Sequence, residues 1–534
     1  MSARLAPVLL LSALLGGCAT LPPGSAYPKL ASVALAHPEE TRSGTQFSAA
    51  ALEHEGNSAF RIITVGVDGF LLRAQMIDAA ERTLDLQYYI FRGDETGRLL
   101  SMALLRAADR GVRVRVLVDD GDTQAGDEQV LELAAHPGIE VRIFNPFAYR
   151  GHRKLRRTVE FLLHKRRLDY RMHNKLIVAD NAIALVGGRN VGNQYFQLDP
   201  ESQFADDDVF AAGPITTQLS ATFDDYWNSA LAIPVEALRP EHEHHHAVPA
   251  HGAATRARAR QDLQQLSTGK IDYVGLIATG EPYTGLLGGR LPLVWAHAQV
   301  VCDSPDKQKV DRGTLAGILM REPVSRAASE VRSELLLVTP YLVPAKPELR
   351  MLSELHARQV RIRILTNSLE SAPDLAAHSG YARQRLPLVK TGVELYEVRA
   401  QLANTRGSGQ STAVSRSGNY ALHGKMYVFD RERLFMGSMN FDQRSMHINT
   451  EIGLIIDSPE LASQTAARFA NMVQPGNSYA VVWEGDGAES APRLSWRTEE
   501  NGKPVSYRHE PARGGNWQRF KVWLLTWLPL SGEL

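Results

Sequence analysis

Two stretches of the chain carry almost the same text: RMHNKLIVADNAIALVGGRN at residues 171–190 and ALHGKMYVFDRERLFMGSMN at residues 421–440. In each stretch one residue separates a His from a Lys, an Asp follows five positions after the Lys, and a Gly-x-x-Asn closes the unit. These residues are His173, Lys175, Asp180, Gly187 and Asn190 in the first copy and His423, Lys425, Asp430, Gly437 and Asn440 in the second. A lone His-x-Lys is uninformative, whereas two copies with identical spacing indicate a duplicated functional unit.

Each copy also predicts a β-hairpin. Residues 176–179 and 183–186 are apolar and rich in branched side chains, and the pair Asp-Asn lies between them. Side chains at i and i+2 of a strand share a face, so His173 and Lys175 should point the same way. Asn190 should return close to them, and the same reasoning applies to the second copy.

The double motif resembles the phospholipase D superfamily. The pattern H-x-K-x4-D-x6-G-[GS]-x-N, present twice, is the hallmark of that family. The resemblance implies an α/β fold of two tandem, pseudo-symmetric sandwich domains with one shared active site. Its GGRN form at residues 187–190, TPYLVP at 339–344 and the segment at 378–381 look like the bacterial cardiolipin synthase and lipoprotein branch.

An internal repeat extends beyond the motifs. GVRVRVLVDD at 111–120 matches QVRIRILTNS at 359–368, and GIEVRIF at 138–144 matches GVELYEV at 392–398. The first copy opens with an expected helix at 69–80, strand at 83–91, helix at 96–110 and strand at 112–118. This alternation favours a parallel α/β sheet. A strand before Cys302 should open the second copy, from near residue 293.

The chain start resembles a bacterial lipoprotein signal. Arg4 precedes an apolar run too short to span a bilayer, and Leu15-Gly16-Gly17-Cys18 follows. The resemblance implies lipidation of Cys18 and an anchor on the periplasmic face of the outer membrane; an ordinary secretory signal is the alternative. The expected order is signal 1–18, tether 19–59 with a short helix near 48–55, first domain 60–238, linker 239–270, second domain 271–480 and a Trp-rich extension 481–534.

Composition restricts the function classes. The chain has zero formal net charge and is 44% hydrophobic and 22% charged, which argues against a general nucleic-acid binder. Cys18 and Cys302 are its two cysteines, so no cysteine cluster suggests a metal site. The His-rich segment at 241–252 reads as a polar linker. We expect no cofactor, no metal and no transmembrane helix.

The paired motifs suit phosphodiester chemistry, because imidazole serves both as nucleophile and as proton carrier near neutrality. By resemblance, His173 would attack phosphorus and His423 would protonate the leaving alcohol, although the order could be reversed. Lys175, Lys425, Asn190 and Asn440 would then hold the phosphoryl oxygens.

Carboxylates should support the two imidazoles. Glu451 and Asp208 are the candidates, because TEIGLII and DDVFAAG occupy matching strands after each motif; Asp206 or Asp207 could replace Asp208. Asp180 and Asp430 should be hairpin-turn or supporting residues. Ser438 should be a supporting residue too, and its counterpart Gly188 leaves the first copy one hydroxyl fewer for phosphate contacts. The cardiolipin synthase resemblance extends to His378 and Tyr381 as substrate-binding candidates.

The expected function is a lipid-anchored phosphatidyltransferase that makes cardiolipin through a phosphohistidine. Its partners would be phosphatidylglycerol, phosphatidylethanolamine and an anionic membrane surface; oligomeric state is left open. Hydrolysis of phospholipids by water is the alternative, and a nuclease of the same superfamily is a weaker one. The basic segment 150–171 and the aromatic segment 517–530 could contact lipid, or could be a solvated helix face and a core element.

Overall fold

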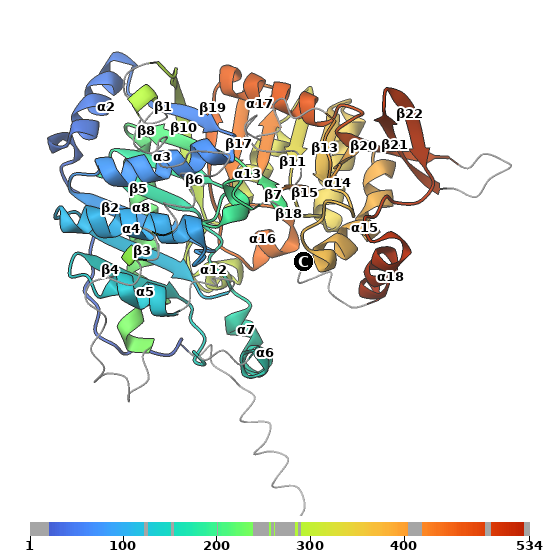
Figure 1. Ribbon diagram of the computed structural model, residues 1–534. Coiled ribbons are helices and arrows are strands. Elements are labelled where there is room, and N and C mark those ends of the chain that lie inside the picture. Colours follow the sequence, from blue (N-terminus) through green and yellow to red (C-terminus); the bar gives the residue numbers. More distant parts are fainter. Residues whose placement is uncertain are drawn as a thin grey trace, which may run out of the picture.

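The chain folds into two similar halves that lie side by side, coloured blue to green and yellow to red in Figure 1. This computed structural model describes residues 21–121, 127–150, 154–199, 201–238, 256–257, 261, 284–286, 290–403, 419–485 and 493–527. Most of the expected linker at 239–270 therefore lies outside the described residues, as does the expected signal at 1–18.

The first half contains η1 (Pro38–Glu40), α2 (Arg42–Glu53), β1 (Ser58–Ile63), α3 (Gly66–Ala79), β2 (Thr83–Tyr88), α4 (Glu95–Asp109), β3 (Arg113–Asp119), α5 (Asp127–Ala134), β4 (Ile139–Phe144), α6 (Lys154–Leu163), α7 (Lys165–Leu168), β5 (Leu176–Ala179), β6 (Ile183–Gly187), η2 (Asn193–Tyr195), β7 (Ser202–Ala205), β8 (Asp208–Ala212), α8 (Ile215–Asn228), β9 (Ala232–Pro234) and η3 (Val235–Leu238). The expected helices and strands of this half are confirmed, with bounds shifted by a few residues.

The second half contains β10 (Val294–Cys302), α12 (Lys307–Asp311), α13 (Arg321–Ser329), β11 (Glu334–Val338), β12 (Leu342–Val343), α14 (Lys346–Ala357), β13 (Arg361–Asn367), α15 (Leu375–Lys390), β14 (Glu394–Val398), β15 (Asn419–Leu422), β16 (Met426–Phe429), β17 (Arg433–Gly437), β18 (Phe441–Asp442), α16 (Gln443–His447), β19 (Ile452–Asp457), α17 (Pro459–Met472), β20 (Ser478–Glu484), β21 (Arg493–Glu500), β22 (Lys503–Tyr507) and α18 (Gly515–Thr526). Strand β10 is the one expected before Cys302.

The two sheets repeat one strand order. The first runs β1-β8-β6-β5-β2-β3-β4-β9, and the second runs β10-β19-β17-β16-β11-β13-β14-β20 and continues into β21 and β22. Strands β1 and β10 pair with each other and join the sheets into one 18-stranded sheet. The described part of the chain thus shows the predicted duplication.

Each sheet is mixed, which corrects the expectation of a parallel sheet. Pairs β2–β3 and β3–β4 are parallel, as are β11–β13 and β13–β14. The motif hairpins β5–β6 and β16–β17 enter antiparallel. Helical crossovers join the parallel strands, whereas tight turns and short connections join the others. In the sequence, only the crossovers appear as alternating helices and strands, so the pattern predicted the parallel part of each sheet alone.

The turns of the two motif hairpins are built alike. Asp180 and Asn181 have φ of 54° and 50°, and Asp430 and Arg431 have φ of 54° and 58°. Two successive residues with positive φ are typical of the type I′ turn that suits a two-residue hairpin. The Asp180 carboxylate also accepts three backbone N–H groups at the start of β2, from residues 81–83, at 2.7–2.9 Å.

Asp430 does the same for residues 332–334 before β11. Each aspartate therefore ties its hairpin to the neighbouring strand. The expectation that Asp180 and Asp430 are hairpin-turn residues is confirmed.

Three apolar cores stabilise the two halves. Helices α3 and α4 cover the outer face of the first sheet, and α13, α14 and α15 cover that of the second. Between the sheets, α8 and α17 share one central core, to which Phe223 of α8 and Phe469 of α17 both belong. A common core fixes the halves against each other, because buried side chains pack at crystal-like density.

Two terminal segments differ from expectation. Residues before α2 lie against the first half: Lys29 donates to Ala232 O at 2.8 Å, and Arg115 donates to Ser32 O at 2.9 Å. This packing contrasts with a free tether. At the other end, β21 and β22 continue the second sheet, so the boundary expected at 480 falls inside β20.

None of the helices in the described ranges combines the length and the apolar character needed to cross a membrane.

Candidate active site

Beside the motifs, short segments of the two halves pair with each other. Strand β15, which leads into His423, pairs with β7 of the first half, and a single bridge joins Met172 to Thr450. The backbone N–H of His423 donates to Ala205 O at 2.7 Å, and that of His173 donates to Thr450 O at 2.9 Å. Each motif histidine is therefore held by the half that does not contain it.

His173 pairs with Glu451 of the second half. Its Nδ1 lies 2.8 Å from Glu451 Oε2, and both side chains are buried. Burial, together with the charges of Lys175, Lys425 and His423, holds the pKa of His173 well below its usual range. The charges of the second motif reach this ring, so both motifs share one electrostatic environment.

The Glu451 carboxylate is itself firmly placed. Ser445 Oγ donates to Oε1 at 2.7 Å, and Ser438 Oγ donates to Oε2 at 2.5 Å. Burial raises the pKa of Glu451 to about 7, against the opposing charge of Lys175. Ser438 thus positions the carboxylate, which agrees with the supporting role expected for it.

His423 pairs with Asp206 of the first half. Its Nδ1 lies 2.5 Å from Asp206 Oδ2. Burial lowers the pKa of His423 to about 4 although Asp206 opposes the shift. Burial acts to raise the pKa of Asp206, yet the charge and hydrogen bond of His423 and the charges of Lys425 and Arg189 lower it overall. Asp206 is therefore an anion beside the ring.

Asp208 occupies a different place, and its assignment to an imidazole was wrong. Its carboxylate accepts from Arg73 Nη1 at 2.8 Å and Nη2 at 3.0 Å, and from Arg189 Nη1 at 2.9 Å. All three side chains are buried. Side chains alternate across a strand, so Asp206 could not have been separated from Asp208 without the register. Asp207 forms an ion pair with Arg468.

The two lysines are buried beside their histidines. Lys175 Nζ donates to His173 O at 2.6 Å, and Lys425 Nζ lies 3.1 Å from His423 Nδ1. Burial lowers the pKa of Lys425 to about 8 and that of Lys175 well below its usual range, although Glu451 and Asp206 oppose both shifts. A bound anion would favour the protonated form of both amines, because an opposite charge nearby raises their pKa.

The two asparagines differ. Asn190 Oδ1 accepts from the Ile90 N–H at 3.1 Å, and its Nδ2 donates to Tyr195 Oη at 2.9 Å. Asn440 Oδ1 is buried and has no hydrogen-bond partner within the described part of the chain. The Asn440 amide is therefore the one with capacity left for a bound group.

Aromatic rings enclose the imidazoles, and sequence reasoning missed them. Tyr89 makes an edge contact with His173 at 5.1 Å between ring centroids, and Tyr195 makes one with His423 at 5.2 Å. Phe204 stacks on His423 at 5.2 Å. Tyr89 follows β2 and lies more than 80 residues before the first motif, whereas Tyr195 in η2 lies five residues after Asn190. The second motif has no Tyr at the position that matches Tyr195, so the duplication did not point to it.

Sterics explain why residue 188, the counterpart of Ser438, is a glycine. A Cβ at this position would lie 2.1 Å from Asp206 Oδ1. The first motif therefore lacks a side chain where the second has a hydroxyl, because the shorter aspartate reaches its histidine through that space.

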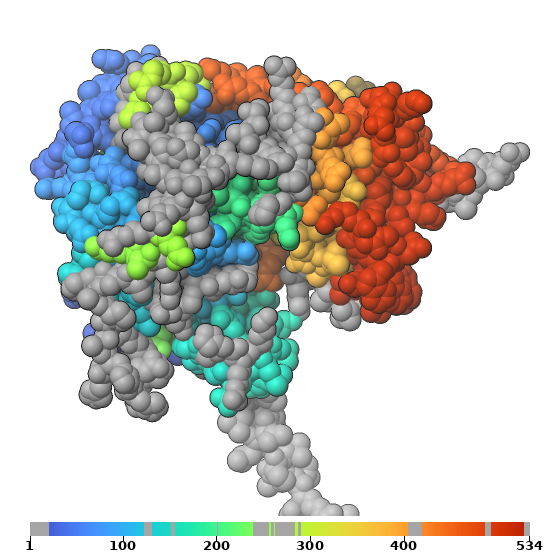
Figure 2. Space-filling view, viewed as in Figure 1, coloured from blue at the N-terminus to red at the C-terminus, as the bar shows by residue number. Residues whose placement is uncertain are grey.

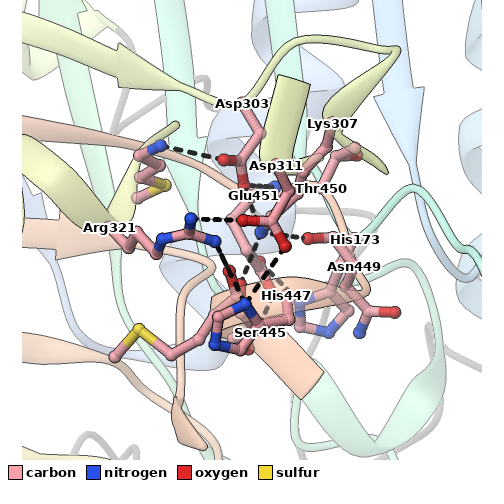
Figure 3. A network of polar contacts seen from close by, with 12 residues as sticks. His173, Asp303, Lys307, Asp311, Arg321, Ser445, His447, Asn449, Thr450 and Glu451 are labelled. Carbon is pink, nitrogen blue, oxygen red and sulfur yellow. Dashed lines mark hydrogen bonds and ion pairs between the residues drawn. The ribbon is translucent and has the colours of Figure 1, made fainter. Parts of the chain in front are cut away.

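A polar network lies behind Glu451 (Figure 3). Lys307 Nζ donates to Asp303 Oδ2 at 2.8 Å and to the carbonyl oxygens of Ser445 and Asn449, each at 2.6 Å. Asp303 Oδ2 accepts the Glu451 N–H at 3.0 Å. Nothing in the sequence marked this pair, which fixes the backbone of the segment that carries Glu451.

His378 and Tyr381 lie in a buried ionic cluster. His378 Nε2 is 2.7 Å from Glu510 Oε1, and Tyr381 Oη donates to Glu397 Oε1 at 2.7 Å. Arg385 joins both carboxylates. These contacts assign both side chains a structural role in α15, and substrate binding by them stays a prediction.

Within the described ranges, the structure has no group of three His, Cys, Asp or Glu residues arranged to hold a metal ion. Cys18 lies outside those ranges.

Similar proteins agree with this architecture. The family "Cardiolipin synthase, PLD-like domain" matches residues 74–227 and 325–473. Cardiolipin synthase C of Escherichia coli K12 is 34% identical over 90% of this chain and 97% of its own length. Major cardiolipin synthase ClsA of Bacillus subtilis 168 is 25% identical over 76% of this chain and 67% of its own.

Among solved structures, the phosphatidylserine synthase of Haemophilus influenzae Rd KW20 matches with a TM-score of 0.52 at 12% identity. The match covers 82% of this chain and 92% of that one, and shows the shared fold. With two copies of one domain, two intact motifs and an extensive match to the curated relatives, the chain belongs to the cardiolipin synthase family of phospholipase D-like enzymes.

Proposed function

We propose that this phosphatidyltransferase makes cardiolipin: it transfers a phosphatidyl group from one glycerophospholipid to a hydroxyl group of another, through a phosphohistidine. The single observation that carries the proposal is the crossed arrangement in which His173 meets Glu451 and His423 meets Asp206. Both carboxylates bind Nδ1, which leaves Nε2 of each ring for a reacting atom.

The asymmetry of the two pairs supports different roles for the histidines. Asp206 is anionic and opposes the lowering of the pKa of His423, whereas Glu451 beside His173 has its own pKa raised to about 7, and burial and the charges near His173 lower the pKa of that ring. The pKa of His423 is about 4 in the free enzyme, and the negative charge of a bound phosphodiester would raise it, so that this ring can carry the proton. A nucleophile must be unprotonated and a general acid must carry a proton. His173 is therefore the proposed nucleophile, and His423 is the proposed acid and base.

In the first step, His173 Nε2 forms a bond to phosphorus and the bond to the headgroup oxygen breaks. The departing oxygen takes the proton of His423. In the second step, His423 removes the proton of the acceptor hydroxyl, whose oxygen attacks phosphorus and releases His173. Protons balance over the cycle, and His423 returns to its starting state.

The lysines and Asn440 would stabilise the phosphoryl oxygens. Lys175 and Lys425 lie in a water-poor site where a fixed cation interacts strongly with developing negative charge. Their low pKa values rise once a phosphate anion binds, because an opposite charge favours the protonated amine. Of the Asn440 amide, only the NH2 group can donate a hydrogen bond to a phosphoryl oxygen, whereas its oxygen, unpaired within the described residues, can accept one from a substrate hydroxyl.

The proposal is tested with purified enzyme and labelled phosphatidylglycerol, with and without phosphatidylethanolamine, by mass spectrometry of the products. Cardiolipin is the expected product. Phosphatidic acid alone would make the enzyme a hydrolase, and cleavage of DNA without lipid turnover would make it a nuclease.

Two variants test the roles of the histidines. His173→Ala should form neither product nor phosphoenzyme. His423→Ala should accumulate an acid-labile phosphohistidine when the substrate is an activated lipid. The leaving group of such a lipid departs without a proton, so the first step does not need His423. A phosphohistidine mapped to residue 423 would reverse the assignment.

We also propose that Cys18 carries a lipid and holds the enzyme at the periplasmic face of the outer membrane. The support is the sequence Leu15-Gly16-Gly17-Cys18 alone. Cys18→Ser should abolish incorporation of labelled palmitate, whereas Cys302→Ser should not. Equal labelling of both variants would overturn the assignment.

A further inference from the structure

Helix α6 turns its apolar face to solvent. Leu155, Val159, Leu162 and Leu163 are 47–76% exposed. At 100° per residue these four positions fall on one stripe of the helix. Outside this stripe α6 contacts the body: Glu160 accepts the N–H groups of Ala148 and Tyr149, at 2.6 and 2.9 Å.

Helix α18 also turns its apolar face to solvent. Trp517, Phe520, Trp523, Leu524 and Trp527 are 46–73% exposed and share one face. On the other face Val522 is buried, and Gln518 Nε2 donates to Leu369 O at 2.9 Å. A surface helix normally buries its apolar stripe, so two helices that expose it indicate an apolar partner.

Both helices lie on the side of the molecule that carries α16. Figure 1 shows α6 below α16 and α18 to the right of it, and Figure 2 shows a hollow between the two protruding regions. Arg444 of α16 donates to Asp169 Oδ1, after α7, at 2.7 Å and acts on the pKa of His173. The region between α6 and α18 thus adjoins the candidate active site.

The charges around these faces identify the partner. Arg156 is exposed on α6, Arg166 is exposed on α7, which follows α6 directly, and Lys521 is exposed on α18. The one acidic residue of α6, Glu160, points inward, and α18 contains none. Two such surfaces would repel each other in a homodimer, whereas anionic lipid headgroups complement them. Tryptophan is also favoured at the level of the headgroups.

We propose that the exposed faces of α6 and α18 form a docking surface that inserts into the headgroup region of an anionic phospholipid bilayer. The surface holds the mouth of the active site against the membrane, so that a phospholipid enters without crossing bulk water. This orientation rests on the proposed function, whereas insertion itself does not.

Insertion is tested by quenching of tryptophan emission in the full chain on phosphatidylglycerol vesicles with brominated acyl chains. Quenching of the wild type should fall by more than half in Trp523→Phe/Trp527→Phe, which keeps apolar rings and removes two reporters. Equal quenching in both proteins would overturn the role of α18.

A matched pair of added reporters tests α6. Leu155→Trp places a tryptophan at a leucine that is 76% exposed, and Leu52→Trp places one in α2 at a leucine that is 83% exposed. Extra quenching is expected from position 155 and not from position 52. Equal extra quenching at both positions, or none at 155, would refute a surface that includes α6.

Electrostatic complementarity is tested by vesicle composition and charge removal. Arg156→Gln/Arg166→Gln should weaken binding to phosphatidylglycerol vesicles by about fivefold per charge and leave binding to phosphatidylcholine unchanged. A loss that is equal on both vesicles would exclude anionic recognition. Sedimentation that shows a dimer through these faces, without quenching by brominated lipid, would assign the surface to a second copy.

Two variants distinguish failure of the docking surface from failure of the proposed function. His173→Ala should insert like the wild type and form no product, whereas Leu155→Ser/Trp523→Ser should lose vesicle binding by roughly tenfold or more. The same double variant should retain turnover of a short-chain phospholipid kept below its aggregation concentration. Lost turnover there would mean that the two helices serve the site itself and would overturn the docking role.

Discussion

Exchange of Asp206 for Asn tests the carboxylate beside His423. The carboxylate lies 2.5 Å from Nδ1, and both groups are buried. Asn keeps the size and an acceptor oxygen but loses the charge that stabilises the imidazolium. A hydrogen bond to a charged group contributes about 1.5–3 kcal/mol. Because ~1.4 kcal/mol corresponds to a tenfold rate, kcat should fall by about 10- to 150-fold.

Asp208→Asn is the matched control, two residues away and equally buried. It leaves the guanidinium groups of Arg73 and Arg189 without their counter-charge in the core. Loss of one partner from a buried ion pair costs about 3–5 kcal/mol of unfolding free energy. Asp208→Asn should therefore lower the Tm clearly, whereas Asp206→Asn should leave it nearly unchanged.

The measurement pairs steady-state phosphatidyl transfer with thermal unfolding for both variants. We expect a rate defect without a stability defect at position 206 and a stability defect at position 208. If Asp208→Asn is the one that keeps its Tm and loses kcat, the structure assigns the wrong carboxylate to His423.

Three further variants address the rest of the site. Lys425 has its pKa lowered to about 8, so loss of its proton above that pH should reduce kcat/KM; in Lys425→Arg, which stays charged, the alkaline fall should move to higher pH in a pH–rate profile. Gly188→Ala should displace Asp206, because the added Cβ would lie 2.1 Å from its Oδ1, and should lower kcat at least as much as Asp206→Asn; an unchanged rate would contradict the steric argument. Lys307→Met should leave Asp303 unpaired and cost about 3–5 kcal/mol in chemical denaturation.

The fold could be predicted because the motif carries its own local structure. Apolar runs flank an Asp-led turn in both copies, and an identical hairpin forms around each turn. Duplication of the surrounding strands then follows from matching text such as GVRVRVLVDD and QVRIRILTNS. The strands after each hairpin, β8 and β19, were also predicted, but their antiparallel direction was not, because a short apolar run has the same appearance in either direction.

The carboxylate partners required the strand register. Gly187 pairs with Asp208 and Gly437 pairs with Gly453, so Asp208 corresponds to Gly453 and Asp206 to Glu451. The sequence match of DDVFAAG to TEIGLII was therefore displaced by two positions. An even displacement keeps the residue on the same side of the strand, so alternation could not expose the error.

The crossed pairs also explain why duplication could produce a single site. Each half supplies a histidine and the carboxylate that its partner's histidine needs, so neither half has a complete pair of its own. Two features hold the histidines and carboxylates in place across the halves. Strand β7 pairs with β15, and α8 and α17 share the central core. Once the halves depend on each other in this way, each motif can diverge. The first motif has Gly188 beside Asp206, whereas the second has Ser438 beside Glu451. The different carboxylates then give two related imidazoles different proton affinities, which is what a two-step transfer with one nucleophile and one acid requires.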